Sequence, residues 1–317
     1  MDLFENVKAK MSSAGAYTLQ FFSLLELLGN EAVIEWCQNE GMIAKSVKCP
    51  NCGCEMKLRE RRDRSDGYEW RCRKQGGVNA HDVKRSVRRG TWFETSRLDI
   101  CKILRLTRFW YLRNEQKGVR QELNLAEHTV VDWYMFCREV CMLMMLNESV
   151  PLGGKGVIVE IDESKFGKMK YGRGKPVDGQ WVFGLIERST DKCMFKVVKD
   201  RSKATLLPII RDWVLPGSIV MSDCWKAYDC LKDHDFELLR VNHSLHFKDP
   251  DSGAHTNSIE GTWSALKRSM PNNHAKGEFD SYLAEYMWRR LHGRSSDDYF
   301  GLFLKAVVTL YPPAEKE

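Results

Sequence analysis

The sequence lacks a long uninterrupted apolar run. Its richest apolar stretch, Phe21 to Leu28, is shorter than the roughly 20 residues that a membrane-spanning helix needs, and it carries Glu26. The N-terminus has no basic segment followed by a cleavable apolar run. We therefore expect neither a signal peptide nor a membrane span.

A disulfide framework and a strong charge imbalance are also missing. The chain has 11 cysteines, an odd number, and they cluster tightly only at Cys49, Cys52 and Cys54; this usage favours a reducing compartment. By itself, the formal net charge of +6 over 317 residues excludes no class of binding partner. Basic residues nevertheless crowd between Lys57 and Arg89. They predict either a surface that neutralises phosphates or a solvated face of the protein.

Changes in hydrophobic periodicity divide the chain into five regions. The apolar stripe of the first region breaks at Gly29, helical periodicity is lost in the second, and Pro151 to Gly154 marks the start of the fourth. The regions are an N-terminal helical segment (1–45), a cysteine-containing basic module (46–95), a second helical region (96–150), a domain of mixed strands and helices (151–300) and a C-terminal helix and tail (301–317).

The third region predicts three helices, at about 100–110, 118–123 and 129–146. Residues 124–127 form a short turn between the last two. Two helices joined by a tight turn are typical of a helix-turn-helix, whose second helix enters the major groove. An ordinary helical linker domain fits the same pattern, and the pattern alone leaves both open.

The fourth region predicts an α/β fold. Strands at 157–161, 181–186 and 194–198 form a meander, after which helices and strands alternate. This order gives a mixed sheet with helices on its faces, and it is the order of the ribonuclease H-like fold. The later elements are expected at 204–214, 218–222, 228–232, 237–241 and 256–269.

Two aspartates follow apolar strands of this domain. Asp162 is expected at the end of the first strand and Asp223 at the end of the fourth, and these strands are neighbours in such a fold. Phosphodiester cleavage uses two divalent ions about 3.5–4 Å apart, held by hard oxygen ligands. Each aspartate alone is also typical of a turn or a helix cap. Glu160 shares a face with Asp162 by strand alternation and is the main competing ligand.

A third ligand is expected on the long helix that follows. Glu260 is the acidic candidate, and Asn257 lies three residues earlier on the same helical face. Lys267, two turns after Glu260, is placed to contact a phosphate. Ile259, Trp263 and Leu266 are expected to face the core.

The second region predicts a structural zinc site. Zinc prefers four tetrahedral Cys or His ligands, and Cys49 and Cys52 have the spacing of a knuckle. Cys72 is the third candidate, but Gln75 stands where a second Cys-x2-Cys pair would end. His81 is the nearest further ligand, and Cys54 is the alternative. Free buried thiols would explain the same cysteines without a metal.

These motifs together resemble the Merlin-type DDE transposases and their bacterial insertion-sequence relatives. The resemblance covers about residues 45 to 295. It rests on Cys49-Pro50-Asn51-Cys52-Gly53, Gly90-Thr91-Trp92-Phe93-Glu94-Thr95-Ser96, Asp162-Glu163-Ser164, Ser222-Asp223 and His255-Thr256-Asn257-Ser258-Ile259-Glu260, continuing through Trp263 and Lys267-Arg268.

The resemblance implies a cut-and-paste DNA transposase that uses two Mg²⁺ or Mn²⁺ ions held by Asp162, Asp223 and Glu260. Some bacterial relatives use an asparagine at the position of Asn257, which leaves the third ligand open. The implied partners are double-stranded DNA, as terminal inverted repeats and as target. Supporting or DNA-contacting roles fall to Asn257, Lys267, Arg268, Arg88 and Arg89.

Transposition joins two ends, so a homodimer or larger assembly on DNA is expected. The Cys/His spacing favours a nuclear protein, and a bacterial cytoplasm would suit the same chemistry. One alternative is a domesticated transposase that binds specific DNA without cutting it. Another is a non-transposing ribonuclease H-like nuclease, which the two N-terminal modules disfavour.

Overall fold

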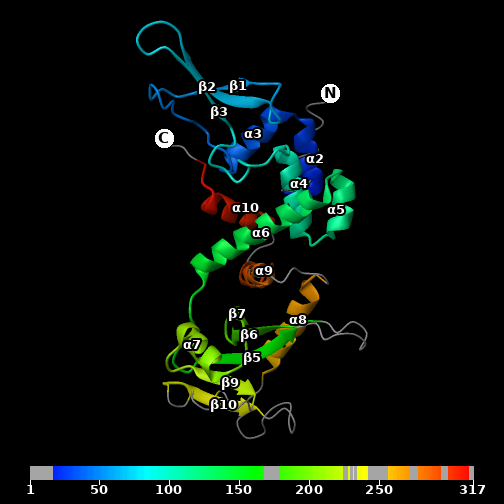
Figure 1. Cartoon of the computed structure of the whole chain (residues 1–317), viewed down its shortest axis with the longest axis vertical. Helices are drawn as coiled ribbons and strands as arrows, with labels where there is room; N and C mark the ends of the chain where they lie inside the picture. The colour runs from blue at the N-terminus through cyan, green and yellow to red at the C-terminus, as the bar shows by residue number, and fades with distance from the viewer. Residues whose placement is uncertain are drawn as a thin grey trace. The chain divides into compact units, whose positions relative to one another are not determined.

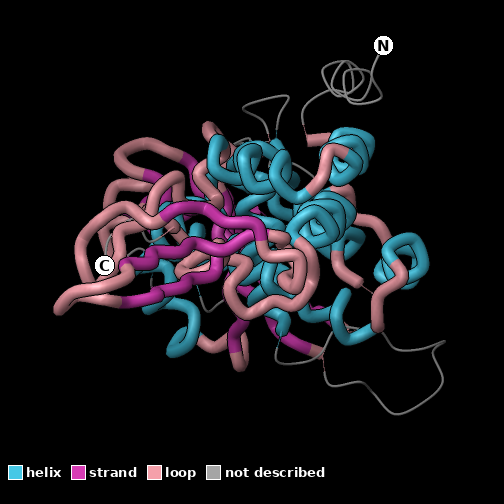
Figure 2. Tube along the Cα trace, turned by 90° about the horizontal axis from the view of Figure 1, so that it is seen from above, coloured by secondary structure: helices cyan, strands magenta, loops and turns pink. Residues whose placement is uncertain are grey.

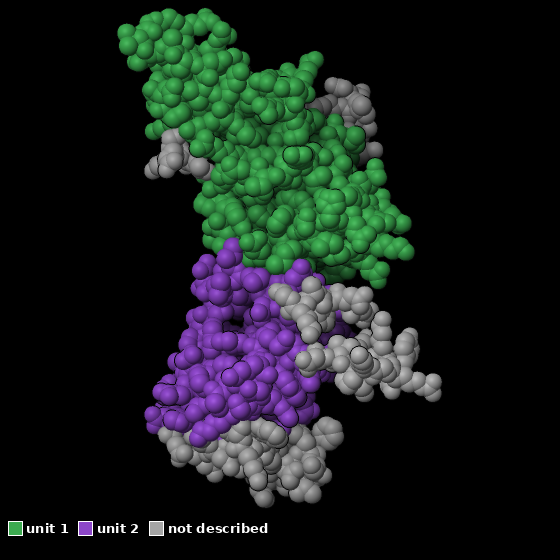
Figure 3. All heavy atoms as spheres, in the orientation of Figure 1, with its two compact units in different colours: residues 1–140, 296–317 green, residues 141–295 purple. Residues whose placement is uncertain are grey.

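The computed structural model describes residues 17–167, 179–223, 228, 231, 234–241, 256–271, 278–293 and 299–313. The chain divides into two compact units (Figure 3). Unit 1 comprises residues 1–140 and 296–317, and unit 2 comprises residues 141–295. Within the described residues, no helix has the length and apolar character needed to cross a membrane.

Unit 1 contains a group of helices whose core is aromatic. Phe22 contacts Trp36 and Phe300 at ring-centroid distances of 5.5 and 6.1 Å. The C-terminal helix therefore packs against the N-terminal ones, although the sequence separates them widely. The helices are α2 (Leu19–Leu27), α3 (Asn30–Asn39), α4 (Ile100–Tyr111), α5 (Gln116–Leu123), α6 (Glu127–Glu148, whose last residues belong to unit 2) and α10 (Tyr299–Leu310) (Figure 1).

Local chemistry sets the ends of these helices as the sequence indicates. The Thr18 hydroxyl accepts a hydrogen bond from the Phe21 backbone N–H at 3.0 Å and caps α2. Gly29, with φ of 93°, separates α2 from α3, which confirms the expected break. Asn124, with φ of 48°, ends α5 in the left-handed conformation before α6 begins. The expected helices are present, and DNA binding by them stays a prediction.

Unit 1 also contains an antiparallel sheet in the order β1-β2-β3. Figure 2 draws all strands of the chain, these included, in magenta. Its strands are β1 (Lys57–Glu60), β2 (Tyr68–Lys74) and β3 (His81–Ser86). Trp70 and Cys72 alternate with polar residues along β2 and are buried. The sheet therefore has one face toward the core of unit 1 and one polar face.

Unit 2 is built on a five-stranded mixed sheet, as the sequence predicts. The strand order is β10-β9-β5-β6-β7; β5, β6 and β7 are antiparallel, and β9 and β10 run parallel to β5. The strands are β5 (Ile158–Phe166), β6 (Gln180–Glu187), β7 (Cys193–Val198), β9 (Ile219–Asp223) and β10 (Glu237–Val241). A separate two-stranded parallel pair joins β4 (Leu152–Gly153) to β8 (Val214–Leu215).

Helices cover both faces of this sheet. Leu206 and Ile210 of α7 (Lys203–Trp213) pack in one core cluster with Val159 of β5. Ile259 of α8 (Asn257–Ser269) and Leu283 of α9 (Phe279–His292) pack in a second cluster on the other face. Burial of apolar side chains on both faces stabilises such a three-layered arrangement.

One boundary differs from the sequence prediction. Asp162 was expected to end its strand, but β5 continues to Phe166 because β6 pairs with it along that whole stretch. Asp223 does end β9, as expected. Of the helix expected at 228–232, only residues 228 and 231 are described, and His255 lies outside the described residues.

Candidate functional site

The two aspartates lie level with each other on adjacent strands of unit 2. β5 and β9 are parallel, with Ile158 opposite Ile219 and Glu160 opposite Met221. Extending this register by two residues brings Asp162 level with Asp223. Neighbouring strands lie about 4.8 Å apart, and by strand alternation Asp162 and Asp223 stand on the same face of the sheet.

The charges of two further acids act on Asp162. Burial raises the pKa of Asp162 to about 6; a hydrogen bond from Trp263 opposes this shift, and the charges of Asp223 and Glu260 add to it. The Trp263 indole Nε1 donates to Asp162 Oδ2 at 2.9 Å. The side chain that the sequence assigned to the core therefore also orients the aspartate, a role that periodicity does not reveal.

Helix α8 places Glu260 toward this pair. Ile259 and Trp263 are buried beneath α8, which fixes the rotation of the helix. The Thr256 hydroxyl donates to Glu260 Oε1 at 3.0 Å. Asn257, one turn earlier, is exposed at the first position of the helix.

Glu160, the competing ligand, is engaged elsewhere. It is fully buried, and its Oε1 accepts hydrogen bonds from Arg188 Nε at 2.9 Å and Nη2 at 2.8 Å. Its Oε2 accepts the Ile259 backbone N–H at 3.0 Å. That N–H is one of the amides that the first turn of α8 cannot satisfy internally. Glu160 thus ties the helix that carries Glu260 to the strand that carries Asp162.

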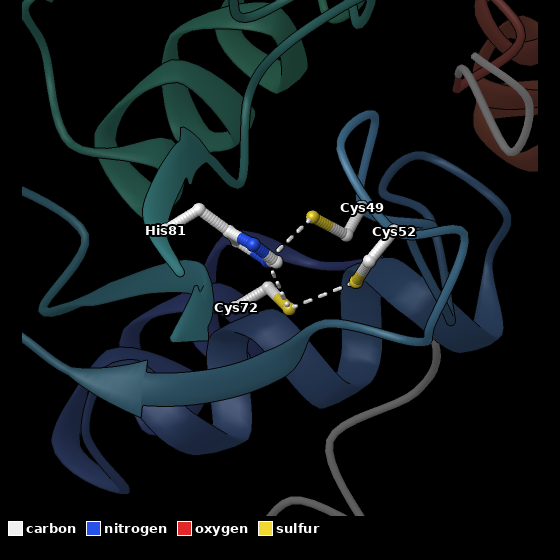
Figure 4. A group of neighbouring side chains, drawn as sticks. All are labelled: Cys49, Cys52, Cys72 and His81. Atoms are coloured by element: carbon white, nitrogen blue, oxygen red, sulfur yellow. Dashed lines mark hydrogen bonds between the residues drawn. The ribbon is translucent and has the colours of Figure 1, made fainter. Parts of the chain in front are cut away.

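A second group of ligand-type side chains lies in unit 1, around the sheet (Figure 4). Cys49, Cys52, Cys72 and His81 have ligand atoms that all lie within 4.8 Å of one another. Among the described residues, no other group of three or more His, Cys, Asp or Glu side chains is this close. Cys54 is exposed and outside the group, so the structure favours His81 as the fourth member.

The spacing of this group fits a tetrahedral metal. Zn–S and Zn–N bonds of about 2.3 and 2.05 Å place ligand atoms about 3.8 Å apart for S···S and about 3.6 Å for S···N. The separations are 3.7 Å for Cys52 Sγ to Cys72 Sγ, and 3.5 and 3.4 Å from His81 Nε2 to Cys49 and Cys72 Sγ. His81 Nδ1 donates to the Asn79 carbonyl at 2.7 Å, which turns Nε2 toward the sulfurs.

Comparisons with known proteins identify the family of the chain. Residues 149–290, which hold the acidic site, match the family model described as ISXO2-like transposase domain. An uncharacterized transposase-like protein of Haemophilus influenzae (strain ATCC 51907 / DSM 11121 / KW20 / Rd) is 41% identical over 95 residues, which are 29% of this chain and 76% of that protein. The chain belongs to the ISXO2-like transposases.

Two solved structures resemble this transposase weakly. One is a chain of the simian T-cell lymphotropic virus intasome in complex with PP2A regulatory subunit B56 gamma, at TM-score 0.29 and 13% identity, covering 60% of this chain and 69% of that chain. The other is the HTLV-2 integrase catalytic core domain in complex with magnesium, at TM-score 0.26 and 11% identity, covering 45% and 87%. TM-scores this low do not establish a shared fold.

The remaining residues named from the sequence are divided between surface and interior. Lys267 and Arg268 of α8 and Arg89 of unit 1 are exposed. Arg88 has a different role from the expected DNA contact. It is 4% exposed, and its guanidinium donates to Asp66 Oδ2 at 2.6 Å and to backbone carbonyls of Ser96 and Leu98. Arg88 therefore holds unit 1 together, and this burial keeps it from DNA.

Removing the Glu160 carboxylate is expected to destabilise unit 2. In Glu160→Ala, Arg188 and the first turn of α8 lose a buried acceptor, which should lower the free energy of unfolding by at least about 2 kcal/mol. Urea unfolding of the purified protein measures the change. The control is Glu237→Ala, which removes an exposed glutamate from β10 of the same sheet. Equal stability of the two variants would contradict the role given to Glu160.

Glu163 points to the face of β5 opposite Asp162, where the Tyr228 hydroxyl donates to it. Burial raises the pKa of Glu163 to about 8, and the charges of Asp162 and Asp223 add to the shift while Arg201 opposes it. The folded state therefore binds this proton more tightly than the unfolded state does. The stability that protonated Glu163 contributes to the folded state is fully present below the ordinary glutamate pKa of 4.5 and is lost as the pH rises to about 8.

We expect the metal-free protein to lose stability between about pH 5 and pH 8, and Glu163→Gln to flatten that loss. The amide keeps the shape of the protonated acid but cannot ionise. Urea unfolding at a series of pH values measures the slope in both proteins. An identical slope in the variant would exclude Glu163 as the source.

Proposed function

We propose that this transposase cuts DNA at the ends of its element and transfers the freed 3′ ends to target DNA, with Asp162, Asp223 and Glu260 as the ligands of two Mg²⁺ or Mn²⁺ ions. The observation that carries the proposal is the parallel register of β5 and β9, which brings Asp162 level with Asp223. Family membership supplies the reaction class.

The donor chemistry supports divalent ions at this place. Carboxylate oxygens are the ligands that Mg²⁺ prefers, and the charges of Asp223 and Glu260 both raise the pKa of Asp162, which supports their assignment to one site. With Asp162, Asp223 and Glu260 holding two such ions, the site would supply activation of the attacking oxygen and stabilisation of the leaving oxygen of the phosphodiester.

The residues of the chain hold and orient these groups. Trp263 fixes one oxygen of Asp162, and Thr256 fixes one oxygen of Glu260. The exposed cations Lys267 and Arg268, in the last turn of the same helix, are positioned for the DNA backbone. Glu260 is the third ligand in this proposal, because its charge raises the pKa of Asp162 whereas Asn257 is neutral.

The Cys49, Cys52, Cys72 and His81 group is proposed to hold one structural zinc ion. Four protein ligands leave no open position for a substrate, so this ion would stabilise unit 1 rather than react. Two element ends must be cut and joined together, and we propose that at least two copies of the chain assemble on DNA.

The proposal is tested with a labelled duplex that carries one end of the element encoding the chain. With Mg²⁺ we expect a cut at the end and, with added plasmid, a joined product; without divalent ion we expect neither. A mobility shift of the duplex without any cut in Mg²⁺ or Mn²⁺ would instead identify a DNA-binding protein that has lost catalysis.

A further inference from the structure

The sheet of unit 1 carries a set of basic side chains on one face. The register sets Lys57 opposite Arg71 and Arg71 opposite Lys84. Three cations therefore stand in a row across strands about 4.8 Å apart, and like charges in such positions destabilise a sheet. Arg59 and Arg73 lie two residues along their strands and share this side. We call these five residues the basic face.

The acids of the same side offset only part of this charge. Asp82 accepts two hydrogen bonds from Arg71, at 2.7 and 2.6 Å, and lies 4.0 Å from Lys84 Nζ. The side chain of Glu69 is 4% exposed and accepts from Arg61 Nη1 at 2.8 Å. The five cations of the basic face therefore have only Asp82 as an exposed carboxylate on their side, because Glu69 is buried and paired with Arg61, so the surface is electropositive.

The other side of the sheet explains why the basic face meets solvent. Trp70 is 5% exposed there, and Cys72 belongs to the metal-ligand group. Core packing and metal binding therefore use one side of the strands. On the basic face, four of the five side chains are exposed and Arg71 is half-buried.

The helical part of unit 1 offers a poorer surface for a polyanion. The exposed residues of α6, the recognition helix that a helix-turn-helix would use, include Glu127 and Asp132 in its first two turns and Glu139 further along. Arg120 pairs with Glu127 at 3.0 Å, which occupies a nearby cation. Carboxylates repel phosphates, so the charges of unit 1 favour the sheet.

We propose that the basic face binds the phosphate backbone of duplex DNA without reading its sequence. The choice of DNA rests on the proposed function and on charge density. Duplex DNA carries one charge per about 1.7 Å of its axis, which suits cations spaced about 4.8 Å across the strands and about 6.8 Å along them.

The test compares two triple variants of the full, zinc-loaded chain. Lys57→Gln, Arg73→Gln and Lys84→Gln together remove three cations of the basic face and keep the Arg71–Asp82 pair. Lys45→Gln, Lys117→Gln and Lys305→Gln remove three exposed cations elsewhere in unit 1 and cause the same change in net charge. Binding to a labelled duplex of arbitrary sequence is measured by fluorescence anisotropy without added Mg²⁺, over a range of salt concentrations.

Each phosphate contact contributes about 0.9 to the magnitude of the slope of log affinity against log salt concentration. The basic-face variant lacks three such contacts, so the magnitude of its slope should be smaller by about 2.7. Between about 50 and about 200 mM salt, wild-type binding should therefore weaken about 40-fold more than binding by this variant. The control variant should keep the wild-type slope. Equal slopes in the two variants would overturn the proposal, as would an acidic polypeptide that competes as well as duplex DNA.

A footprint on the wild-type chain gives a test that needs no variant. Bound DNA should protect Lys57 and Lys84, but not Lys45 and Lys117, from acetylation measured by mass spectrometry. Equal protection of all four would reject the basic face. Neither measurement involves cleavage, so the two proposals can fail independently. If only the catalytic proposal fails, the basic face still binds DNA but no Mg²⁺-dependent products form.

Discussion

Asp162→Asn is expected to reduce cleavage of element-end DNA at least about 10³-fold while leaving DNA binding within about twofold of wild type. The substitution keeps the side-chain shape and the partner of Trp263 but removes the charge that a divalent ion needs. Stabilisation of transition-state charge by metals contributes several kcal/mol, and each 1.36 kcal/mol is a factor of ten in rate. Single-turnover cleavage in Mg²⁺, with binding measured in parallel, checks the result.

The matched control for this substitution is the next residue. Glu163→Gln also removes a partly buried carboxylate from β5, but on the opposite face, where Tyr228 donates to it. Its cleavage rate should stay within about tenfold of wild type. If Asp162→Asn cuts DNA as fast as Glu163→Gln, Asp162 does not hold a catalytic ion.

Cys72→Ser is expected to abolish zinc binding and to unfold the sheet of unit 1. Binding energies of structural zinc in small domains reach about 10–16 kcal/mol, and this energy is folding energy when the site does not form without metal. Cys72 lies in the central strand β2 and contacts both Cys52 and His81 in the ligand group. Zinc content by mass spectrometry and the rate of proteolysis between residues 46 and 95 measure the two effects.

Cys54→Ser provides the comparison, because Cys54 is exposed and lies outside the group. It should keep one zinc ion per chain and wild-type resistance to protease. Loss of zinc from this variant and retention by Cys72→Ser would reverse the assignment of ligands.

Local patterns predicted the sheet of unit 2 well. Apolar strands with period two, separated by helical stretches, indicated the order that the structure has, and strand β10 (Glu237–Val241) was predicted to the residue. The fold that this order indicated has the strands of Asp162 and Asp223 as neighbours, and the structure pairs them in parallel as β5 and β9. Alternation along one strand could not tell Glu160 from Asp162, because both residues point to the same face.

Only contacts between residues far apart in the sequence distinguished the roles of Glu160 and Asp162. Glu160 pairs with Arg188 and accepts a hydrogen bond from the start of α8, 99 residues away. Asp162 instead accepts a hydrogen bond from Trp263, and the charges of Asp223 and Glu260 raise its pKa. The same is true of Arg88. The position of Arg88 in a basic segment predicted a contact with DNA. Only the three-dimensional structure showed its ion pair with Asp66 in the interior of unit 1.

The sequence by itself determined which strands form, which face of each is apolar and which residue types are available as ligands, because these properties depend on neighbours within a few positions. The tertiary structure decided that His81 rather than Cys54 joins the cysteine group. It also decided that α10 packs with the N-terminal helices and that five cations line one side of β1, β2 and β3. These outcomes depend on pairing register and on long-range packing, which local periodicity does not specify.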